Sequence, residues 1–285
     1  MSTQREDARL WRVDILGGLE LLRARFVDFT FPAHAHEEFM IAVTEEGFAA
    51  PWYRGDTHLH GPGDMIVLNP GEVHGGGPAR GSVWEYRALY PSADLLRRAV
   101  RELSGTDGDA PRFAETVVRD PVVAAAIRRA HKRLEEPCSM LERETRLLHA
   151  LGCLIARHAV DRVPSHRLGS EHRAVERARS YLEAHPAENV RLQKLACEAG
   201  LSPFYLCRVF HRQTGLSPHA FQTLARVRLA KALLAAGVPV PQAAIEAGFC
   251  DQAHLTRHFK RVYGVTPGRY AGRSSRLPGS FRVYS

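Results

Sequence analysis

Residues 195–221 read LACEAGLSPFYLCRVFHRQTGLSPHAF, and residues 243–270 read AAIEAGFCDQAHLTRHFKRVYGVTPGRY. The second stretch repeats the first: Glu198-Ala199-Gly200 matches Glu246-Ala247-Gly248, and the later matches are Leu206, Arg208, Phe210 and Arg212 with Leu255, Arg257, Phe259 and Arg261. An internal repeat of this length predicts one supersecondary unit used twice.

Each copy has the pattern of two helices joined by a tight turn. Leu192, Leu195, Ala196 and Ala199 recur at helical spacing, and Val240, Ala243, Ala244 and Ala247 repeat that spacing. Gly200 and Gly248 follow as helix-ending residues, which suits the left-handed position just beyond a helix. Ser202-Pro203 then predicts the start of the next helix, with a capping hydroxyl followed by proline.

The second helix of each copy has one apolar face and one exposed basic face. The apolar positions are Leu206, Val209 and Phe210, and in the second copy Leu255, Phe259 and Val262. Small, basic and amide side chains on the opposite face are those that read base edges in the major groove. The predicted DNA-binding residues are Phe204, Tyr205, Cys207, Arg208, His211 and Arg212 in the first copy, and Gln252, Ala253, His254, Thr256, Arg257, Lys260 and Arg261 in the second.

The charge distribution agrees with a DNA-binding C-terminal half. Residues 166–285 hold 18 Lys and Arg against 7 Asp and Glu, a net charge of +11, whereas residues 1–165 hold 21 against 24, a net charge of −3. Between the repeats, Ser217-Pro218 and Gly237 delimit a helix of about 18 residues, roughly 27 Å long. Such a helix can hold two recognition helices about one turn of DNA apart.

These residues resemble the AraC/XylS family of bacterial transcription regulators over residues 172–271. The resemblance is carried by Ala247-Gly248-Phe249, Leu255, Phe259-Lys260, Gly264, Thr266-Pro267 and Tyr270. It implies two helix-turn-helix units on a linking helix, double-stranded promoter DNA as partner, and RNA polymerase as a further partner of an activator. The base-facing positions that it implies are Phe204, Cys207, Arg208, Gln252, Ala253, Thr256 and Arg257, and Cys207 departs from the polar residue often found there.

The N-terminal region has the pattern of a small all-β barrel. Short β-prone runs at residues 21–31, 39–44, 65–68 and 83–90 are broken by Gly61-Pro62-Gly63-Asp64 and Asn69-Pro70-Gly71. His34-Ala35-His36 and the segment from Gly63 to His74 resemble the two cupin motifs, which implies the sensor barrel commonly joined to this DNA-binding unit. His58 and His60 are interpreted as loop residues.

Several side chains of the barrel are candidates for a small-molecule effector site. His34, His36 and Glu38 share one face of a predicted strand, and a barrel can bring His74 beside them. We expect an effector pocket without metal or other cofactor, because Met40 and Ile41 stand where metal cupins carry a glutamate. The alternative is a metal site of His34, His36, Glu38 and His74. The predicted effector-binding residues are His34, His36, Glu38, His74, Trp84 and Tyr86, and Trp52 and Tyr53 are further pocket candidates.

Residues 91–103, 120–135 and 139–161 follow with helical patterns. Leu141, Leu148, Leu151 and Ile155 lie on an apolar face of the last helix, for which the family resemblance implies a homodimer interface; packing on the barrel is the alternative. We therefore expect an effector-binding and dimerisation domain at 1–163, a linker at 164–171, the double helix-turn-helix domain at 172–273 and a tail at 274–285.

The fold class predicted is thus α+β with two domains: a cupin-like β-barrel with appended helices, then an all-α DNA-binding domain. The longest apolar run, residues 147–156, is about half of what spans a bilayer, and five cysteines without a CxxC spacing fit reduced thiols. We expect a cytoplasmic regulator, not an enzyme, that is controlled by an effector. The alternative function is a metal-dependent cupin enzyme fused to a DNA-binding domain.

Overall fold

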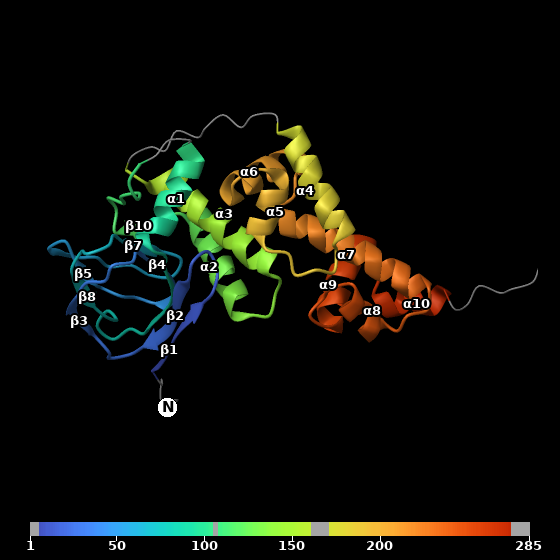
Figure 1. Ribbon diagram of the computed structural model, residues 1–285. Helices are drawn as coiled ribbons and strands as arrows, with labels where there is room; N and C mark the ends of the chain where they lie inside the picture. The colour runs from blue at the N-terminus through green and yellow to red at the C-terminus, as the bar shows by residue number, and fades with distance from the viewer. Residues whose placement is uncertain (1–5, 105–107, 161–170, 275–285) are drawn as a thin grey trace, which may run out of the picture. The chain divides into compact units, whose positions relative to one another are not determined.

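The computed structural model describes residues 6–104, 108–160 and 171–274, and Figure 1 labels its helices and strands. Two compact units are present, one of residues 1–136 and 143–169 and one of residues 137–142 and 170–285. We call them the barrel unit and the helical unit. Of the expected linker and tail, only residues 171 and 274 lie within the described part of the chain.

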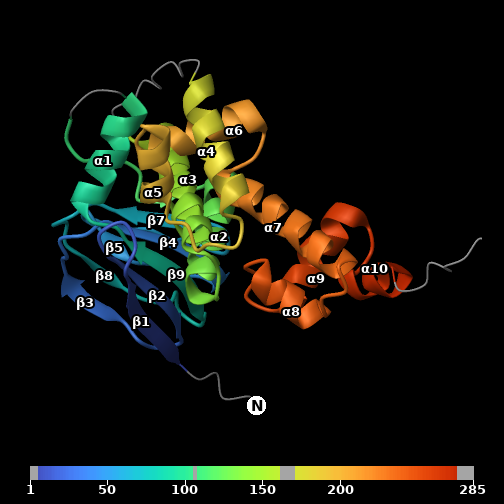
Figure 2. The same cartoon turned by 45° about the vertical axis from the view of Figure 1, so that its right-hand side comes forward.

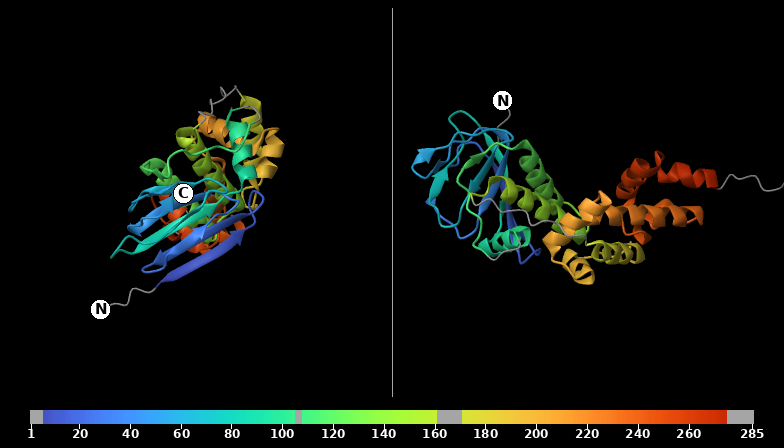
Figure 3. Two further views of the ribbon diagram at one scale, coloured as in Figure 1. Left: turned by 90° about the vertical axis from the view of Figure 1, so that its left-hand side faces the viewer. Right: turned by 90° about the horizontal axis from the view of Figure 1, so that it is seen from above.

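The barrel unit consists of two antiparallel sheets (Figure 3). The six-stranded sheet has the order β1-β2-β9-β4-β7-β10, and the four-stranded sheet the order β3-β8-β5-β6. The strands are β1 Asp7–Val13, β2 Leu19–Phe26, β3 Phe31–His34, β4 Met40–Gly47, β5 Trp52–Tyr53, β6 Asp56–Thr57, β7 Met65–Leu68, β8 His74–Gly76, β9 Trp84–Tyr90 and β10 Val117–Val118.

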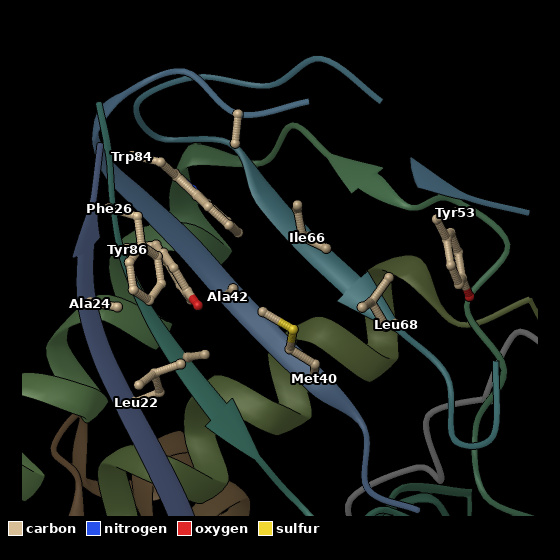
Figure 4. Close-up of a cluster of buried hydrophobic side chains, with 12 residues drawn as sticks. Leu22, Ala24, Phe26, Met40, Ala42, Tyr53, Ile66, Leu68, Trp84 and Tyr86 are labelled. Atoms are coloured by element: carbon tan, nitrogen blue, oxygen red, sulfur yellow. The ribbon is translucent and has the colours of Figure 1, made fainter. Parts of the chain in front are cut away.

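Alternation along the strands decides which side chains face the barrel interior. Even-numbered residues of β2, β4, β7 and β9 form one buried cluster, which contains Leu22, Met40, Ile66 and Tyr86 (Figure 4). Odd-numbered residues of the same strands, such as Ile41 and Val67, point to the opposite face because side chains alternate with a period of two. They are also buried, at 0% and 1% exposure, so both faces of this sheet are covered.

The four predicted runs contain strands, but the short strands β5, β6, β8 and β10 were not predicted. The run at 21–31 divides into β2 and β3, and β1 was not predicted. β1 lies at the edge of its sheet, pairs only with β2 and is largely exposed, so it lacks the apolar alternation that marks a half-buried strand. His60 lies in the connection between β6 and β7, as expected of a loop residue, but it is 2% exposed and forms an isolated bridge to Ala49.

Helices α1 Ala93–Ser104, α2 Pro121–Glu135 and α3 Met140–His158 follow the strands. α2 packs on β4 and β9. Asp120 caps α2: its Oδ1 accepts hydrogen bonds from the backbone of Val122 and Val123, and its Oδ2 lies 2.6 Å from Arg157 Nε and 2.9 Å from His158 Nε2. The start of α2 is therefore tied to the end of α3.

His131 on α2 anchors that helix to the six-stranded sheet. Its Nε2–H donates to the carbonyl of Leu22 at 3.1 Å, and its Nδ1 accepts from Arg87 Nη1 at 3.1 Å. A carbonyl only accepts and a guanidinium only donates, so the two partners require the neutral imidazole. Burial, together with the charge of Arg87, lowers the pKa of His131 to about 3.

The helical unit contains α4 His172–Ala184, α5 Leu192–Ala199, α6 Pro203–Thr214, α7 Pro218–Ala235, α8 Val240–Glu246, α9 Gln252–Tyr263 and α10 Pro267–Ser274. The predicted linking helix is α7, and it runs between α4–α6 and α8–α10 (Figure 2). Over the parts of the chain that are described, no helix has the length and apolar character needed to cross a membrane.

The pH dependence of stability should report on His131. Its pKa is lower in the folded chain than in the unfolded chain, so the unfolded state binds more protons below about pH 6.5, and acid favours unfolding. Between pH 7 and pH 5 this residue should cost about 2 kcal/mol of the free energy of unfolding. His131→Gln should remove that part of the loss in urea titrations, whereas the exposed His211→Gln should leave it. An unchanged pH dependence in His131→Gln would contradict this account.

Gly248 should tolerate alanine poorly for two reasons. Its φ is +82°, in the left-handed region, and an added Cβ would lie 2.6 Å from the carbonyl oxygen of Ala187. Gly237, with φ of +86° and open space around its Cα, has only the first problem. Gly237→Ala should cost about 1 kcal/mol of unfolding free energy, and Gly248→Ala clearly more. Equal losses in urea unfolding would show that the close approach to Ala187 is unimportant.

Candidate DNA-binding face and ligand pocket

The first copy of the repeat folds as α5, a tight turn and α6. α5 ends at Gly200, whose φ of 68° is left-handed, and the side chain of Ser202 accepts a hydrogen bond from the backbone of Tyr205 at the start of α6. The predicted apolar residues Leu206, Val209 and Phe210 are buried. The local signals in the sequence therefore correspond to the observed helix ends.

The second copy folds as α8, a turn and α9, and Asp251 caps α9 by accepting a hydrogen bond from the backbone of His254. Leu255 and Phe259 are fully buried, but Val262 is 42% exposed, so its prediction as a buried residue is wrong. Tyr263, four residues after Phe259, packs against the cluster instead. The apolar stripe of α9 thus continues with i+4 spacing at its end.

The predicted DNA-binding residues of α9 lie on an open face. Gln252, Ala253, Arg257, Lys260 and Arg261 are exposed, and His254 and Thr256 are half-buried. This set offers guanidinium, ammonium and amide donors together with a methyl group, the groups that contact bases and phosphates in a major groove.

The corresponding face of α6 is more covered. His211 and Arg212 are exposed, and Tyr205, Cys207 and Arg208 are half-buried. Phe204 is only 5% exposed, so the prediction that its ring faces solvent is wrong. A helical wheel gives the direction of a side chain and not what lies in that direction, and burying a phenyl ring is favourable by about 2 kcal/mol.

Both copies pack on α7. Val227, Ala230 and Leu234 on the second half of α7 form one buried cluster with α8 and α9. On its first half, Phe221 stacks edge-on against Phe210 of α6, with ring centroids 5.6 Å apart. The two recognition helices are therefore held by one continuous helix.

Two buried polar side chains of α7 fasten the loop before α5. Arg226 donates from Nε to the carbonyl of Pro186 and from Nη2 to that of Glu188, both at 2.8 Å, and Gln222 donates to Glu188 at 3.0 Å. Gln222 and Arg226 are one turn apart on α7 and are 1% and 6% exposed. These bonds position the first helix-turn-helix relative to α7.

The barrel unit contains a narrow pocket between its two sheets. Its empty space is about 470 Å³ with the open mouth included. Aromatic and aliphatic side chains form most of its wall: Phe31, Met40, Tyr53, Ile66, Leu68, Trp84, Tyr86 and Tyr90. In Figure 4 Trp84 and Tyr86 lie at one end of this cluster and Tyr53 at the other.

Three histidines supply the polar part of the pocket wall. His34 of β3 pairs with His74 of β8, and their ring centroids are 4.3 Å apart. The ring of His36 lies 4.9 Å from that of His74. His36 lies beyond the end of β3, so the prediction that both histidines share a strand face is wrong, although both line the pocket.

The Trp84 end of the pocket is closed by stacked rings. Trp84 and Tyr86 stack with centroids 4.0 Å apart, and Trp84 Nε1 donates to Thr44 Oγ1 at 3.4 Å. Thr44 Oγ1 also lies 2.9 Å from Nδ1 of the buried His60, and burial lowers the pKa of His60 to about 4. This end is therefore packed by aromatic rings, although Nε2 of His60 has no hydrogen-bond partner among the described residues.

Two predicted pocket residues do not line it. Glu38 is absent from the pocket wall, and Trp52 is 43% exposed because it alternates with the inward-facing Tyr53 on β5. Without Glu38, the alternative metal site has His34, His36 and His74 alone. Among the described residues, no group of three or more His, Cys, Asp or Glu side chains has the arrangement of a metal site.

The residues predicted to form a dimer interface are inside the chain. Leu141, Leu148, Leu151 and Ile155 are 0–2% exposed, as are Leu147 and Leu154. At 100° per residue, these side chains span about 140° of the circumference of α3, which is wider than the seam of a coiled coil. The prediction of a dimer interface from these side chains is therefore wrong, and packing within the chain is observed.

Comparisons with protein families match both units. The model of an AraC-like ligand binding domain matches residues 16–151, and that of a helix-turn-helix domain matches residues 195–273. The chain is 31% identical over 237 residues to the uncharacterized HTH-type transcriptional regulator YbfI of Bacillus subtilis, covering 83% of this chain and 86% of that protein.

Solved structures resemble the units separately. The DNA-binding domain of AdpA, solved with a target DNA, is 28% identical and covers 37% of this chain and 98% of its own, with a TM-score of 0.34. A cupin-like protein of Thermotoga maritima is 18% identical and covers 32% of this chain and 71% of its own, with a TM-score of 0.29.

Replacing Arg226 should loosen the first helix-turn-helix. Arg226→Leu leaves the carbonyl of Pro186 without its donor, so we expect a loss of about 1–3 kcal/mol of unfolding free energy. Arg228→Leu, an exposed arginine on the same helix whose Nη1 is 4.0 Å from Glu183, should change it by less than about 0.5 kcal/mol. Urea unfolding of the full chain measures both, and similar losses would mean that the buried bonds contribute little.

Proposed function

This chain belongs to the AraC family of transcriptional regulators, and from this premise we propose that it binds promoter DNA sequence-specifically under the control of a small molecule held in its barrel. The observation that carries the DNA-binding part is the exposed basic face of α9, on a helix that is matched by α6 and joined to it through α7. Two recognition helices on one rigid helix fit successive major-groove segments on one side of a duplex.

In this proposal Arg257 and Gln252 make base contacts, and Lys260 and Arg261 contact phosphates. Arginine can donate two hydrogen bonds to a guanine, and glutamine can pair with adenine, so the first two residues supply sequence discrimination. The ammonium and guanidinium groups further along α9 supply affinity that depends on salt concentration. On α6 the same roles fall to Arg208 and, for phosphates, to His211 and Arg212.

The barrel is proposed to sense the effector. Its pocket is lined by His34, His36, His74, Trp84 and Tyr86, and the family match over residues 16–151 is to a ligand-binding domain. An effector regulates DNA binding only if its affinity differs between two arrangements of the protein. We assign effector binding to residues 1–163 and DNA binding to residues 172–273.

The remaining assignments follow from this role. We propose that the chain is a regulator without enzymatic activity, that it acts in the cytoplasm as a homodimer, and that it contacts RNA polymerase if it is an activator. A dimer would use a surface other than the buried leucine face of α3.

Arg257→Ala should weaken binding to the specific site by about 1–3 kcal/mol, while binding to random DNA of the same length should weaken much less. The specific site is found by mapping the genomic positions that the protein occupies, and both affinities are measured by titration at fixed salt.

Arg97→Ala is the matched control, because it removes one exposed positive charge from α1 in the barrel unit. It should change the ratio of specific to random binding by less than twofold. If Arg257→Ala weakened both DNAs equally, or if genomic occupancy were spread evenly over the chromosome, sequence-specific readout by α9 would be wrong.

A further inference from the structure

The three pocket histidines are all held through the same ring atom. The Nδ1 atoms of His34, His36 and His74 lie 2.9, 2.8 and 3.0 Å from the backbone carbonyl oxygens of Pro32, Glu38 and Glu72. Each of these carbonyls belongs to a residue two positions away in the chain. A carbonyl oxygen only accepts, so each Nδ1 must carry a hydrogen and donate it.

This arrangement determines what the rings offer to the pocket. In a neutral imidazole only one nitrogen is protonated, so with the hydrogen at Nδ1 the Nε2 atom is a hydrogen-bond acceptor. Nε2 of His36 is buried and has no hydrogen-bond partner among the described residues. A buried polar atom without a partner is unfavourable, and a ligand that donates a hydrogen bond to it removes that cost.

The pocket wall, as far as the chain is described, offers no carboxylate to pair with a protonated ring. None of the described residues that line the pocket is Asp, Glu, Lys or Arg. Two carboxylates lie near the pocket. Glu72 is paired with Arg54 at 2.8 Å, and the negative charge of Glu20 raises the pKa of Tyr90. Burial lowers the pKa of His74, and the neighbouring His34 and His36 lower it further.

We propose that the pocket binds a small uncharged molecule with an apolar body, which donates hydrogen bonds from O–H or N–H groups to Nε2 of His36 and His74. This inference rests on the proposed role of the barrel as effector sensor. The apolar body lies against the aliphatic and aromatic wall formed by Met40, Leu68 and Tyr90, which line the same pocket.

A carboxylate does not suit this site. It brings only acceptor oxygens, which would face the acceptor nitrogens of the histidines, and no arginine or lysine in the pocket wall offsets its charge. It could accept hydrogen bonds from the Nε2 atoms only if the rings took up protons. An amide or alcohol of the same shape pairs with Nε2 directly.

The first test is the protonation state of the rings. The full chain, labelled with ¹⁵N at histidine, is observed by NMR at pH 7.5, and the signals of His36 and His74 are assigned from their absence in His36→Leu and His74→Leu. We expect one N–H nitrogen and one lone-pair nitrogen in each ring. Two N–H nitrogens in both rings would overturn the proposal, as would stoichiometric bound metal in the purified chain that is lost in either variant.

The second test uses three probes with one ring and different heads: benzamide donates through N–H, methyl benzoate only accepts, and benzoate is an anion. At 10 mM, benzamide should raise the melting temperature of the full chain by about 1–3 °C and the other two by less than about 0.5 °C. His36→Leu and His74→Leu should lose the benzamide shift.

His58→Gln is the matched control, because His58 is a barrel histidine whose Nε2 lies 2.9 Å from the carbonyl of Tyr53 and which does not line the pocket. It should keep the shift. If a leucine variant is unfolded, His36→Asn, read by the same shift, takes its place. A shift with benzoate at least as large as with benzamide, or no shift with benzamide, overturns the proposal.

Failure of this inference is distinguishable from failure of the proposed function. The probe and NMR measurements use the protein without DNA, so they test ligand chemistry alone. If benzamide binds through His36 and His74 but no ligand of this kind changes promoter binding, the ligand class stands and effector control is wrong. If promoter binding responds only to an acidic metabolite, effector control stands and the ligand class is wrong.

Discussion

The packing of two helix-turn-helix units on α7 is the constraint on which the DNA-binding half depends. Phe221, Gln222 and Arg226 hold the first unit, and Val227, Ala230 and Leu234 hold the second. Because these contacts are buried and continuous along one helix, neither recognition helix can shift without exposing apolar surface or breaking hydrogen bonds. The spacing of the two basic faces is therefore a property of α7.

In the barrel, successive side chains along each strand point to opposite faces of the sheet. Even-numbered residues of β4, β7 and β9 line the pocket, and odd-numbered residues such as Ile41 and Val67 are buried on the opposite face. On that opposite face α2 packs against the sheet, where the neutral ring of His131 hydrogen-bonds to the carbonyl of Leu22 and to Arg87. The strands that form the pocket wall are therefore packed on both of their faces.

The polar chemistry of that pocket comes from short-range backbone contacts. Each of the three histidines is oriented by a carbonyl two residues away, and pairing of β3 with β8 then brings His34 beside His74. The histidines are thus preorganised as acceptors before any ligand arrives. Preorganisation of this kind reduces the entropy that a ligand must overcome on binding.

The amino-acid sequence by itself determined the elements whose signals are local. The repeat, the glycines at 200 and 248, the Ser202 cap and the apolar stripes predicted the helices of both helix-turn-helix copies. The net charges of opposite sign in the two halves of the chain indicated which half binds DNA. Only the tertiary structure decided burial: Phe204 and Val262 differ from prediction, and the leucine face of α3 is buried, which selects packing within the chain over a dimer interface. Periodicity gives a side chain's direction, whereas its exposure depends on which distant segment packs there. For the same reason the strand β1 and the exclusion of Glu38 from the pocket wall became visible only in the folded chain.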